Sequence, residues 1–556
     1  MSGVPAPTTP PVAARRAALD ALARETFDVL VVGGGITGAG VARDAAMRGL
    51  HTALVEKDDF ASGTSSRSSR LVHGGVRYLE HGELRLVFEA SQERRTLQRI
   101  ASHLVRPLAF TWPVYAGARI ARWKLGAGLA MYDLLAAFRN VARHERLSTA
   151  DVLRREPRLR PDGLRGGARY WDAHTDDARL TLATIRSAIT AGATVVNHAR
   201  VTAMLQTGGR VTGARVKDEL EGGEVEVRAR VVVNATGPWS DDTERLAGST
   251  TPAVHGSKGV HILVPRGRIG NEAALTLLTP ADGRVFFVLP AGDMAIIGTT
   301  DTFESVNPDD VRASRVDVAY LLDAANHFFP AAALTTDDVI AAWAGLRPLV
   351  ASEASGGDPG DVSREHAVSE RVPGLVRITG GKLTTYRIMA RDTVDAVQRS
   401  LSARRVRART AELPLAGGGL TDPLKAIGTA TTLVGDGAVA SRLVHAHGDR
   451  WREVWALAER DATLAARIDP LRPYVLAESR WAVEQELACT LADLLVRRIP
   501  LAFETRDHGR SGARVLAPLA AEWLGWDEDR VRAELDRYDA EVARLFTIES
   551  GGPADR

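Results

Sequence analysis

The sequence predicts an α/β fold in which a Rossmann-like dinucleotide-binding domain is interleaved with an antiparallel sheet and followed by a helical domain. Three observations carry this prediction. A complete strand–loop–helix–strand unit occupies Phe27 to Glu56. Short β-branched segments separated by Gly-Gly turns begin at Thr194. After a Pro/Gly stretch that ends at Pro423, the pattern is helical almost to the C-terminus.

The first unit has the glycines of a dinucleotide-binding loop. Asp28 to Val32 is a short apolar run typical of a buried parallel strand, and Ile36 to Arg48 is typical of a helix. Gly33, Gly35 and Gly38 form GxGxxG between them. These positions permit a tight turn, a close approach of the backbone to a pyrophosphate, and close packing of helix on strand, while the helix N-terminus favours phosphate charge.

An acidic residue completes this unit. Thr52 to Val55 is a second strand and ends at Glu56. Glu56 lies about 20 residues beyond the glycines, where a carboxylate accepts hydrogen bonds from an adenosine ribose and where a phosphorylated ribose would want an arginine. A plain βαβ turn is the alternative, but strand, loop, helix, strand and acid all fall in register.

Composition limits the function classes. A chain of 556 residues with net charge +2 should form two or three domains, and it has no basic field that indicates nucleic acid. The single cysteine, Cys489, excludes an internal disulfide, a CxxC pair and a cysteine-ligated iron–sulfur cluster. We expect no metal site. Residues 1–26 should be a disordered and helical extension that is neither signal peptide nor membrane anchor.

Two segments after the first unit have more than one interpretation. Ala61 to Ser69 is rich in serine and suits a backbone that closes around phosphates, although a solvated loop would look similar. His73, Arg77 and Tyr78 surround a double glycine. They indicate either a binding site or a surface turn before a helix.

A basic and aromatic segment precedes an apolar one. Arg119, Arg122, Trp123 and Lys124 stand before Leu125 to Phe138, which Asp133 interrupts and which is too short to span a bilayer. The segment could lie on an anionic membrane surface. An ordinary helix packed on the core is the alternative.

The later part of the chain is predicted to approach the nucleotide again and then to become helical. Short strands from Thr194 to Asn234 are typical of an antiparallel meander that ends in a second crossing at Ala235 to Trp239. Strand Leu375 to Thr379 enters a second glycine-rich turn before a helix, whose N-terminus can face the electron-rich end of a cofactor. Residues 401–423 should be a linker, and residues 424–556 a helical domain for which no chemistry is predicted.

Seven motifs occur together in this order: DVLVVGGGITGAGVARDAAMRG, SSRLVHGGVRYLEHGE, VVVNATGPW, KGVHILVP, IIGTTD, AGLRPL and ITGGKLTTYR. With them the chain resembles the FAD-dependent glycerol-3-phosphate dehydrogenases, of the aerobic and quinone-linked type, within the D-amino-acid oxidase and glycine oxidase superfamily. The resemblance runs from about Phe27 to Leu545. It implies an FAD-binding domain at 27–400 with a substrate-binding domain interleaved at roughly 81–170 and 255–345.

The resemblance also implies roles for individual residues. The cofactor-binding positions would be Gly33, Gly35, Ile36, Thr37, Gly38, Glu56, Lys57, Ser65, Ser66, Ser68, His73, Gly74, Thr236, Gly237, Gly381, Lys382 and Leu383. The substrate pocket would contain Arg77, Tyr78, Arg347, Arg364, Lys382 and Thr300, with His261 nearby. Val260 departs from the family pattern, which has a small residue before this histidine.

The implied reaction is oxidation of sn-glycerol 3-phosphate to dihydroxyacetone phosphate. Hydride would pass from C2 to N5 of a non-covalently bound flavin, and the electrons would pass to a quinone. His261 and Lys382 are the candidate bases, and Lys382 could instead stabilise negative charge; Arg347 would grip the phosphate. The protein would be cytoplasmic, peripheral on the inner face of the membrane, and a candidate homodimer.

Three alternatives remain at this point. The chain could be a glycerol-3-phosphate oxidase that uses oxygen, or another FAD-dependent oxidoreductase acting on amino acids or hydroxy acids. It could also be a flavoprotein with a structural or tRNA-modifying role. The HGGVRY and AGLRPL elements disfavour that last class, as does the absence of a basic face.

Overall fold

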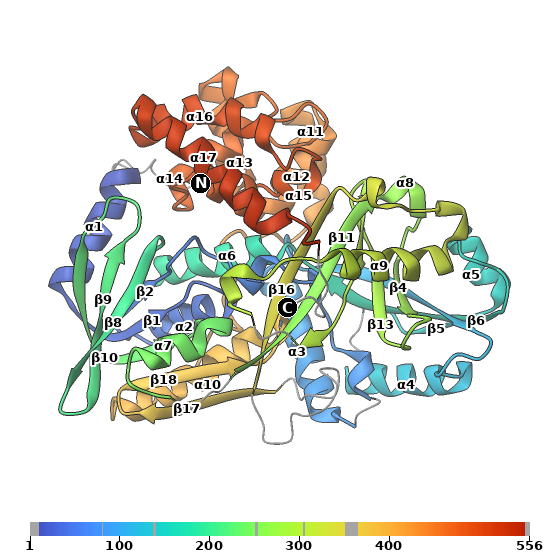
Figure 1. Cartoon of the computed structure of the whole chain (residues 1–556), viewed down its shortest axis with the longest axis horizontal. Coiled ribbons are helices and arrows are strands. Elements are labelled where there is room, and N and C mark those ends of the chain that lie inside the picture. The colour runs from blue at the N-terminus through green and yellow to red at the C-terminus, as the bar shows by residue number, and fades with distance from the viewer. Residues whose placement is uncertain are drawn as a thin grey trace.

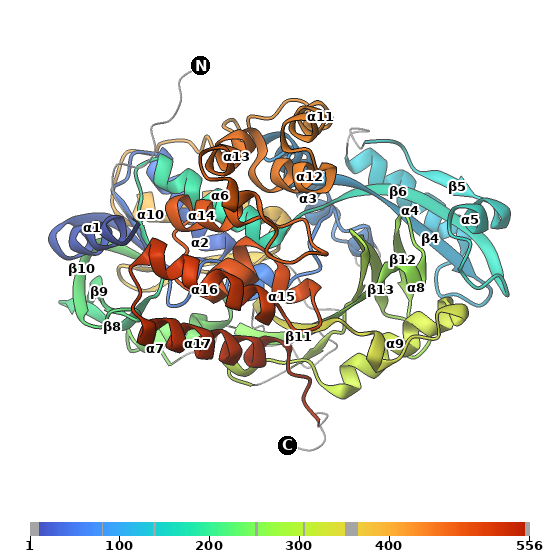
Figure 2. The same cartoon turned by 90° about the horizontal axis from the view of Figure 1, so that it is seen from above.

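The computed structural model describes residues 11–79, 82–136, 141–250, 254–303, 306–350 and 365–550. Figure 1 shows two sheets side by side, with the C-terminal helices above the region where they meet. Figure 2 shows the same helices from above, in orange and red. The predicted α/β class with a C-terminal helical part is confirmed.

The first sheet is mainly parallel and carries the predicted nucleotide-binding unit. Its strand order is β17-β18-β10-β1-β2-β7, with β9 and β8 added beside β10. Its strands are β1 (Thr26–Val32), β2 (Thr52–Val55), β7 (Thr194–Val196), β8 (Ala199–Thr207), β9 (Arg210–Asp218), β10 (Glu224–Asn234), β17 (His366–Val372) and β18 (Leu375–Gly380). The carboxyl ends of β1, β2, β10 and β18 therefore meet along one edge.

The last four residues of β1, Val29 to Val32, are all apolar because both faces of the strand are covered. Val29 and Val31 pack toward helices α2 (Ile36–Met47), α6 (Asp177–Thr190) and α10 (Tyr386–Ser400). Leu30 and Val32 pack toward helix α1 (Pro11–Arg24) and the β8–β10 meander. Successive side chains point to opposite faces of the sheet, and both faces are covered, so the residues on each face must be hydrophobic.

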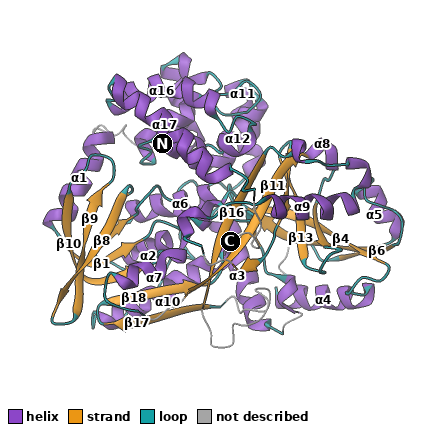
Figure 3. Ribbon diagram, viewed as in Figure 1, coloured by secondary structure: helices purple, strands orange, loops and turns teal. Residues whose placement is uncertain are grey.

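The second sheet is mostly antiparallel. Its order is β15-β11-β14-β13-β12-β4-β6-β3, with β16 beside β11 and β5 beside β6. The strands are β3 (Leu71–Val72), β4 (Arg106–Tyr115), β5 (Glu145–Leu147), β6 (Leu164–His174), β11 (Val254–Pro265), β12 (Ala274–Leu278), β13 (Val285–Ala291), β14 (Met294–Gly298), β15 (Thr302–Phe303) and β16 (Ala341–Val350). Figure 3 shows these strands crossing the half of the molecule opposite β1.

Further helices cover the second sheet or connect it with the first. These are α3 (Leu84–Ile100), α4 (Arg122–Leu135), α5 (Thr149–Arg155), α7 (Ser240–Arg245), α8 (Arg266–Ile269) and α9 (Arg315–Phe328). The C-terminal part consists of α11 (Pro423–Val434), α12 (Gly437–His447), α13 (Trp451–Arg460), α14 (Leu476–Gln485), α15 (Leu501–Glu504), α16 (Arg510–Leu524) and α17 (Glu528–Phe546), with the π-helical turn Asp493–Arg498 between α14 and α15. Within the described ranges, no helix is both long and apolar enough to cross a bilayer.

Several elements differ from the local sequence pattern. Pro107 and Pro113 both lie in β4, where a register shift follows Pro113 and accommodates its missing N–H. The predicted helical domain is interrupted after α14, which ends at Gln485, and Leu487 has φ +56. The apolar helix begins at Arg122 and ends at Leu135, and Phe138 lies outside the described residues.

Candidate active site

One cavity of about 800 Å³ collects residues from both sheets. The ends of β1, β2, β10 and β18 supply one side, and β11 and β16 of the second sheet supply the other. The predicted site residues that line it are Gly33, Gly35, Ile36, Thr37, Glu56, Lys57, Ser65, Ser68, His73, Tyr78, Thr236, Gly237, His261, Arg347, Gly381, Lys382 and Leu383. Positions more than 300 residues apart in the sequence thus share one space.

The glycines at the start of α2 fit the shape of a nucleotide cradle. Gly33 has φ +108, and a Cβ there would lie 2.7 Å from the carbonyl oxygen of Ala235. A Cβ on Gly38 would collide with the carbonyl of Gly33, so this glycine permits packing of α2 on β1 and does not line the cavity. Ser65 closes the cradle, since its Oγ accepts the N–H of Ile36 at 2.9 Å.

Glu56 lies at the end of β2, next to this cradle. Its side chain accepts hydrogen bonds from the backbone N–H of Gly34 at 2.6 Å and of Asp58 at 2.9 Å. Burial raises the pKa of the Glu56 carboxyl to about 7. The carboxylate is therefore fixed by backbone amides while it faces the cavity, the arrangement expected of an acceptor for ribose hydroxyls.

The chain reaches the cavity a second time in the turns that follow β10 and β18. Thr236 and Gly237 follow β10, and the Thr236 hydroxyl donates to Asn234 Oδ1 at 2.7 Å. Gly381 follows β18 with φ +79, and a Cβ there would collide with Met389 of α10. These turns bring backbone groups to the cavity wall that larger residues would block.

Lys382 extends from that turn toward the HGGVRY segment. Its Nζ lies 3.4 Å from the centroid of the Tyr78 ring, a cation–π contact. Both residues line the cavity, together with His73. The structure thus joins the two motifs that the sequence separates by about 300 positions.

His261 of β11 has its ring on the cavity side. Its Nε2 lies 2.8 Å from Ser69 Oγ, and its ring stacks on Trp343 at 5.4 Å between centroids. Burial, with Arg347 and Arg70 nearby, lowers the pKa of His261 to about 3. Val260 points to the opposite face, into the core under α9, because side chains alternate along a strand. Its larger side chain therefore leaves the cavity unchanged.

Arg347 of β16 enters the cavity from the same sheet. Its Nη1 donates to Asp301 Oδ1 at 3.0 Å and to Ser257 Oγ at 3.3 Å, and its Nη2 donates to Thr299 Oγ1 at 3.1 Å. The side chain is 26 % exposed. The guanidinium is thus oriented by a carboxylate and two hydroxyls, and it keeps an accessible edge.

Other predicted residues lie elsewhere. Thr300 does not line the cavity, since its hydroxyl accepts the N–H of Val260 at 2.9 Å; Thr299 lines it instead. Ser66 is buried beside the wall, and Gly74 packs behind it, donating to Tyr132 and Asp172. Two predictions lie outside what is described: the side chain of Arg77 and the whole of Arg364.

The structure adds charged residues that sequence reasoning did not assign to the site. Arg67, Arg119, Arg284 and Asp301 line the cavity. Asp301 is the last residue of the IIGTTD motif, and membership of that motif is the sequence signal that could have identified it. Arg119, which the sequence places in the basic surface segment, is exposed and also lines the cavity.

The residues present fit FAD. The cradle glycines leave room for a pyrophosphate, α2 points its N-terminus at it, and Glu56 stands at the ribose position. Beyond Thr236 and Gly381 the cavity continues to Lys382, His261 and Arg347, where a flavin ring and a substrate would meet.

Comparisons with known proteins agree with this fit. The family model described as FAD dependent oxidoreductase matches residues 28–396. A second model, the C-terminal domain of alpha-glycerophosphate oxidase, matches residues 408–531. This second match covers the helices α11 to α16 and most of the predicted linker.

Named relatives cover nearly the whole chain. A glycerol-3-phosphate dehydrogenase of Mycobacterium leprae is 41% identical over 95% of this chain and 90% of its own length. The mitochondrial glycerol-3-phosphate dehydrogenase of Bos taurus is 38% identical over 95% of this chain and 74% of its own.

A solved structure gives the same answer. The glycerol-3-phosphate dehydrogenase from Bacillus halodurans, complexed with FAD, superimposes with a TM-score of 0.80 at 32% identity, covering 97% of this chain and 100% of that one. The predicted resemblance to the FAD-dependent glycerol-3-phosphate dehydrogenases and the predicted FAD cofactor are thereby confirmed. The chain belongs to the FAD-dependent oxidoreductases and, within them, to the glycerol-3-phosphate dehydrogenase family, with FAD as its cofactor.

Proposed function

We propose that this protein oxidises sn-glycerol 3-phosphate to dihydroxyacetone phosphate. The observation that carries the proposal is the meeting of His261, Arg347 and Lys382 in one cavity. The relatives whose names state this activity are matched over 90% and 74% of their own lengths. Bound FAD supplies the hydride acceptor, N5 of the flavin, for the hydrogen on C2. We propose that its attachment is non-covalent.

Arg347 is the proposed phosphate ligand. A guanidinium can present two parallel N–H groups to phosphate oxygens, which an ammonium cannot do. Its contacts with Asp301, Ser257 and Thr299 fix the plane of the guanidinium before substrate arrives. Arg77 and Arg364 stay candidates for the same grip on the basis of sequence.

His261 is the proposed base, in preference to Lys382. The low pKa of His261 keeps the imidazole neutral and able to accept the substrate hydroxyl proton. A phosphate dianion at Arg347 would neutralise a positive charge that contributes to lowering this pKa, so substrate binding should make His261 more basic. Lys382, held over the Tyr78 ring, is suited to stabilise developing negative charge.

We further propose that a quinone in the bilayer is the electron acceptor and that α4 meets the membrane. Trp123, Met131 and Leu134 form an outward stripe on this helix, exposed by 74%, 42% and 55%. Arg122 and Lys124 are exposed beside it. An apolar stripe flanked by cations is the pattern of a helix that lies in a membrane surface.

The inner face of α4 strengthens this proposal. Leu125 and Leu129 pack in one cluster with Phe110, Trp112 and Tyr170, aromatic residues that also line the cavity. A single helix thus separates the outward stripe from the cavity wall. Figure 1 shows α4 on the side of the molecule away from the C-terminal helices. The proposed location is the inner face of the cell membrane.

Steady-state assays with varied substrates and acceptors test this function. Glycerol 3-phosphate should be turned over, whereas glycerol and a panel of amino acids should not, because glycerol has no anionic group for Arg347 and the amino acids carry an amine in place of the C2 hydroxyl. A soluble quinone analogue should support faster turnover than oxygen. Faster turnover of an amino acid would identify an amino-acid oxidoreductase instead, and equal rates with oxygen would favour an oxidase.

A further inference from the structure

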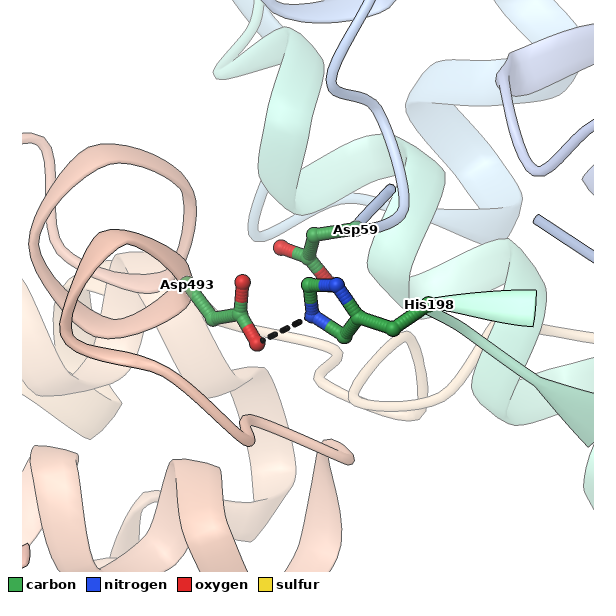
Figure 4. Close-up of side chains that lie close together, drawn as sticks. All are labelled: Asp59, His198 and Asp493. Atoms are coloured by element: carbon green, nitrogen blue, oxygen red, sulfur yellow. Dashed lines mark hydrogen bonds and ion pairs between the residues drawn. The ribbon is translucent and has the colours of Figure 1, made fainter. Parts of the chain in front are cut away.

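A buried cluster joins the C-terminal helices to the nucleotide-binding half. Figure 4 shows Asp59, His198 and Asp493 facing one another, with a hydrogen bond of 3.0 Å between His198 Nε2 and Asp493 Oδ2. One ligand-type atom from each lies within 4.8 Å of the others. Carboxylates with an imidazole at this spacing are residue types that bind divalent metals.

The two carboxylates, however, already accept hydrogen bonds from arginine side chains. Asp59 Oδ2 accepts Arg497 Nε at 2.7 Å and also accepts Arg498 Nη1. Asp59 Oδ1 accepts Asn197 Nδ2 at 3.0 Å. Because two guanidiniums point at the place where an ion would sit, the cluster is a charge-compensated ion-pair junction and not a metal site.

The C-terminal side of the junction holds both arginines firmly. Arg497 also donates to Asp493 at 3.2 Å and to Glu541 of α17 at 3.0 Å. Arg498 Nη2 donates to the carbonyl oxygen of Glu486 at 2.7 Å. Their side chains are only 4% and 1% exposed, so each is fixed by its own domain and reaches out to Asp59.

Asp59 in turn anchors the loop that closes the nucleotide cradle. It is fully buried and lies outside the cavity lining, but Glu56 and Lys57 before it and Ser62 to Ser65 after it all line the cavity. The Ser62 N–H donates to the Asp59 carbonyl at 3.1 Å, and the Ala61 N–H donates to Gly34 at 3.1 Å. The loop is thus held at the cradle on one side and at Asp59 on the other.

We propose that Arg497 and Arg498 act, through Asp59, as positioning residues for this loop and so set how tightly the protein retains FAD. The C-terminal domain would then have a role in cofactor binding although it supplies no residue to the cavity lining within the described ranges. Removing one partner of a buried ion pair leaves the other charge uncompensated, which loosens whatever the pair holds. The inference depends on FAD binding and is independent of the substrate.

FAD release from the purified holoenzyme tests it. After dilution, the rise of flavin fluorescence gives the dissociation rate constant of FAD. Asp59→Asn keeps the shape of the side chain and removes its charge, and it should release FAD about tenfold faster than wild type. Arg498→Lys keeps the charge but cannot reach Asp59 and Glu486 together, so it should accelerate release by about threefold.

Glu534→Gln is the matched control. Glu534 is a buried carboxylate of the same domain that pairs with Arg530 of α17 at 2.9 Å, and it is hydrogen-bonded neither to the loop nor to Arg497 or Arg498. It should lower the melting temperature as Asp59→Asn does but leave FAD release within about twofold of wild type. Equal release rates for wild type, Arg498→Lys and Glu534→Gln would overturn the proposal, even if Asp59→Asn failed to fold.

Discussion

His261 and Arg347 come from neighbouring strands and act on each other through charge. Arg347 helps to keep His261 neutral, and both reach the cavity because β11 and β16 place Trp343 opposite His261 and Arg347 opposite Ser257. The imidazole is held between Trp343, Ser69 and the backbone of Gly298, where any larger residue would strike the ring. A neutral imidazole that can accept a proton and a guanidinium of fixed orientation therefore lie on the same wall of the cavity.

The low pKa of His261 predicts a pH dependence of stability. The folded-state pKa of about 3 lies below the ordinary 6.5, so the stability contributed by neutral His261 is present above pH 6.5 and is lost as the pH falls toward 3. The expected slope is at most about 1.4 kcal/mol per pH unit. His261→Gln should remove this component from urea-unfolding curves measured between pH 4.5 and 7.5. Parallel pH profiles for the two proteins would contradict the assignment.

Arg347→Lys tests the phosphate grip. The ammonium cannot keep three partners and also bind phosphate bidentately, so KM for glycerol 3-phosphate should rise by about tenfold, equivalent to about 1.4 kcal/mol. Glycerol should remain a poor substrate for both proteins. Arg230→Lys, at an exposed ion pair with Asp28, is the control and should leave KM unchanged. An unchanged preference for the phosphorylated substrate would remove Arg347 from the site.

At the scale of elements, helix α4 separates two kinds of surface. Its inner residues complete the core behind the cavity, while its outer residues present the apolar stripe described above. Sequence analysis found this helix and its basic start, but it did not show that the exposed Arg119 also lines the cavity. Hydrophobicity alone cannot tell the inner from the outer side of a helix that is apolar on both.

The membrane proposal predicts cosedimentation with anionic liposomes at low salt. Each basic residue near an anionic surface contributes on the order of 1 kcal/mol, so binding should weaken as salt screens it. Trp123→Ser with Leu134→Ser should reduce binding without loss of bound FAD. Leu424→Ser, at an apolar residue that is 81% exposed on α11, is the control and should bind as wild type does. Wild-type protein that stays in the supernatant at all salt concentrations would end this proposal.

Elements with strong local signals were predictable, and those defined by distant partners were not. The β1–α2–β2 unit and the antiparallel pairing of β8, β9 and β10 match the sequence pattern because glycine turns and periodicity are local. The predicted start of the meander at Thr194 is wrong, because β7 pairs in parallel with β2. Strand β4 was missed, since only pairing with β6 and β12 makes a segment with two prolines extended. Helix α14 ends before Leu487, where Glu486 turns inward to pair with Arg179. No local sequence pattern reveals this pairing.

At the scale of the whole molecule, the C-terminal domain supports the site from outside. Arg497 and Arg498 hold the cradle loop, and Phe503 packs edge-on against Trp343, the residue on which His261 stacks. The motif order predicted the family, the cofactor and the fold class. The sequence assigned no chemistry to the C-terminal helices, because their contacts with Asp59 and Trp343 depend on a domain arrangement that periodicity does not encode.

Anaerobic mixing of the purified protein with glycerol 3-phosphate tests the central claim most directly. The absorbance band of the bound flavin should bleach with glycerol 3-phosphate and remain with glycerol. The His261→Gln variant should retain FAD, but its flavin band should bleach at least about a hundredfold more slowly. A flavin band that glycerol 3-phosphate leaves intact, in protein whose flavin an amino acid bleaches, would contradict the proposed function.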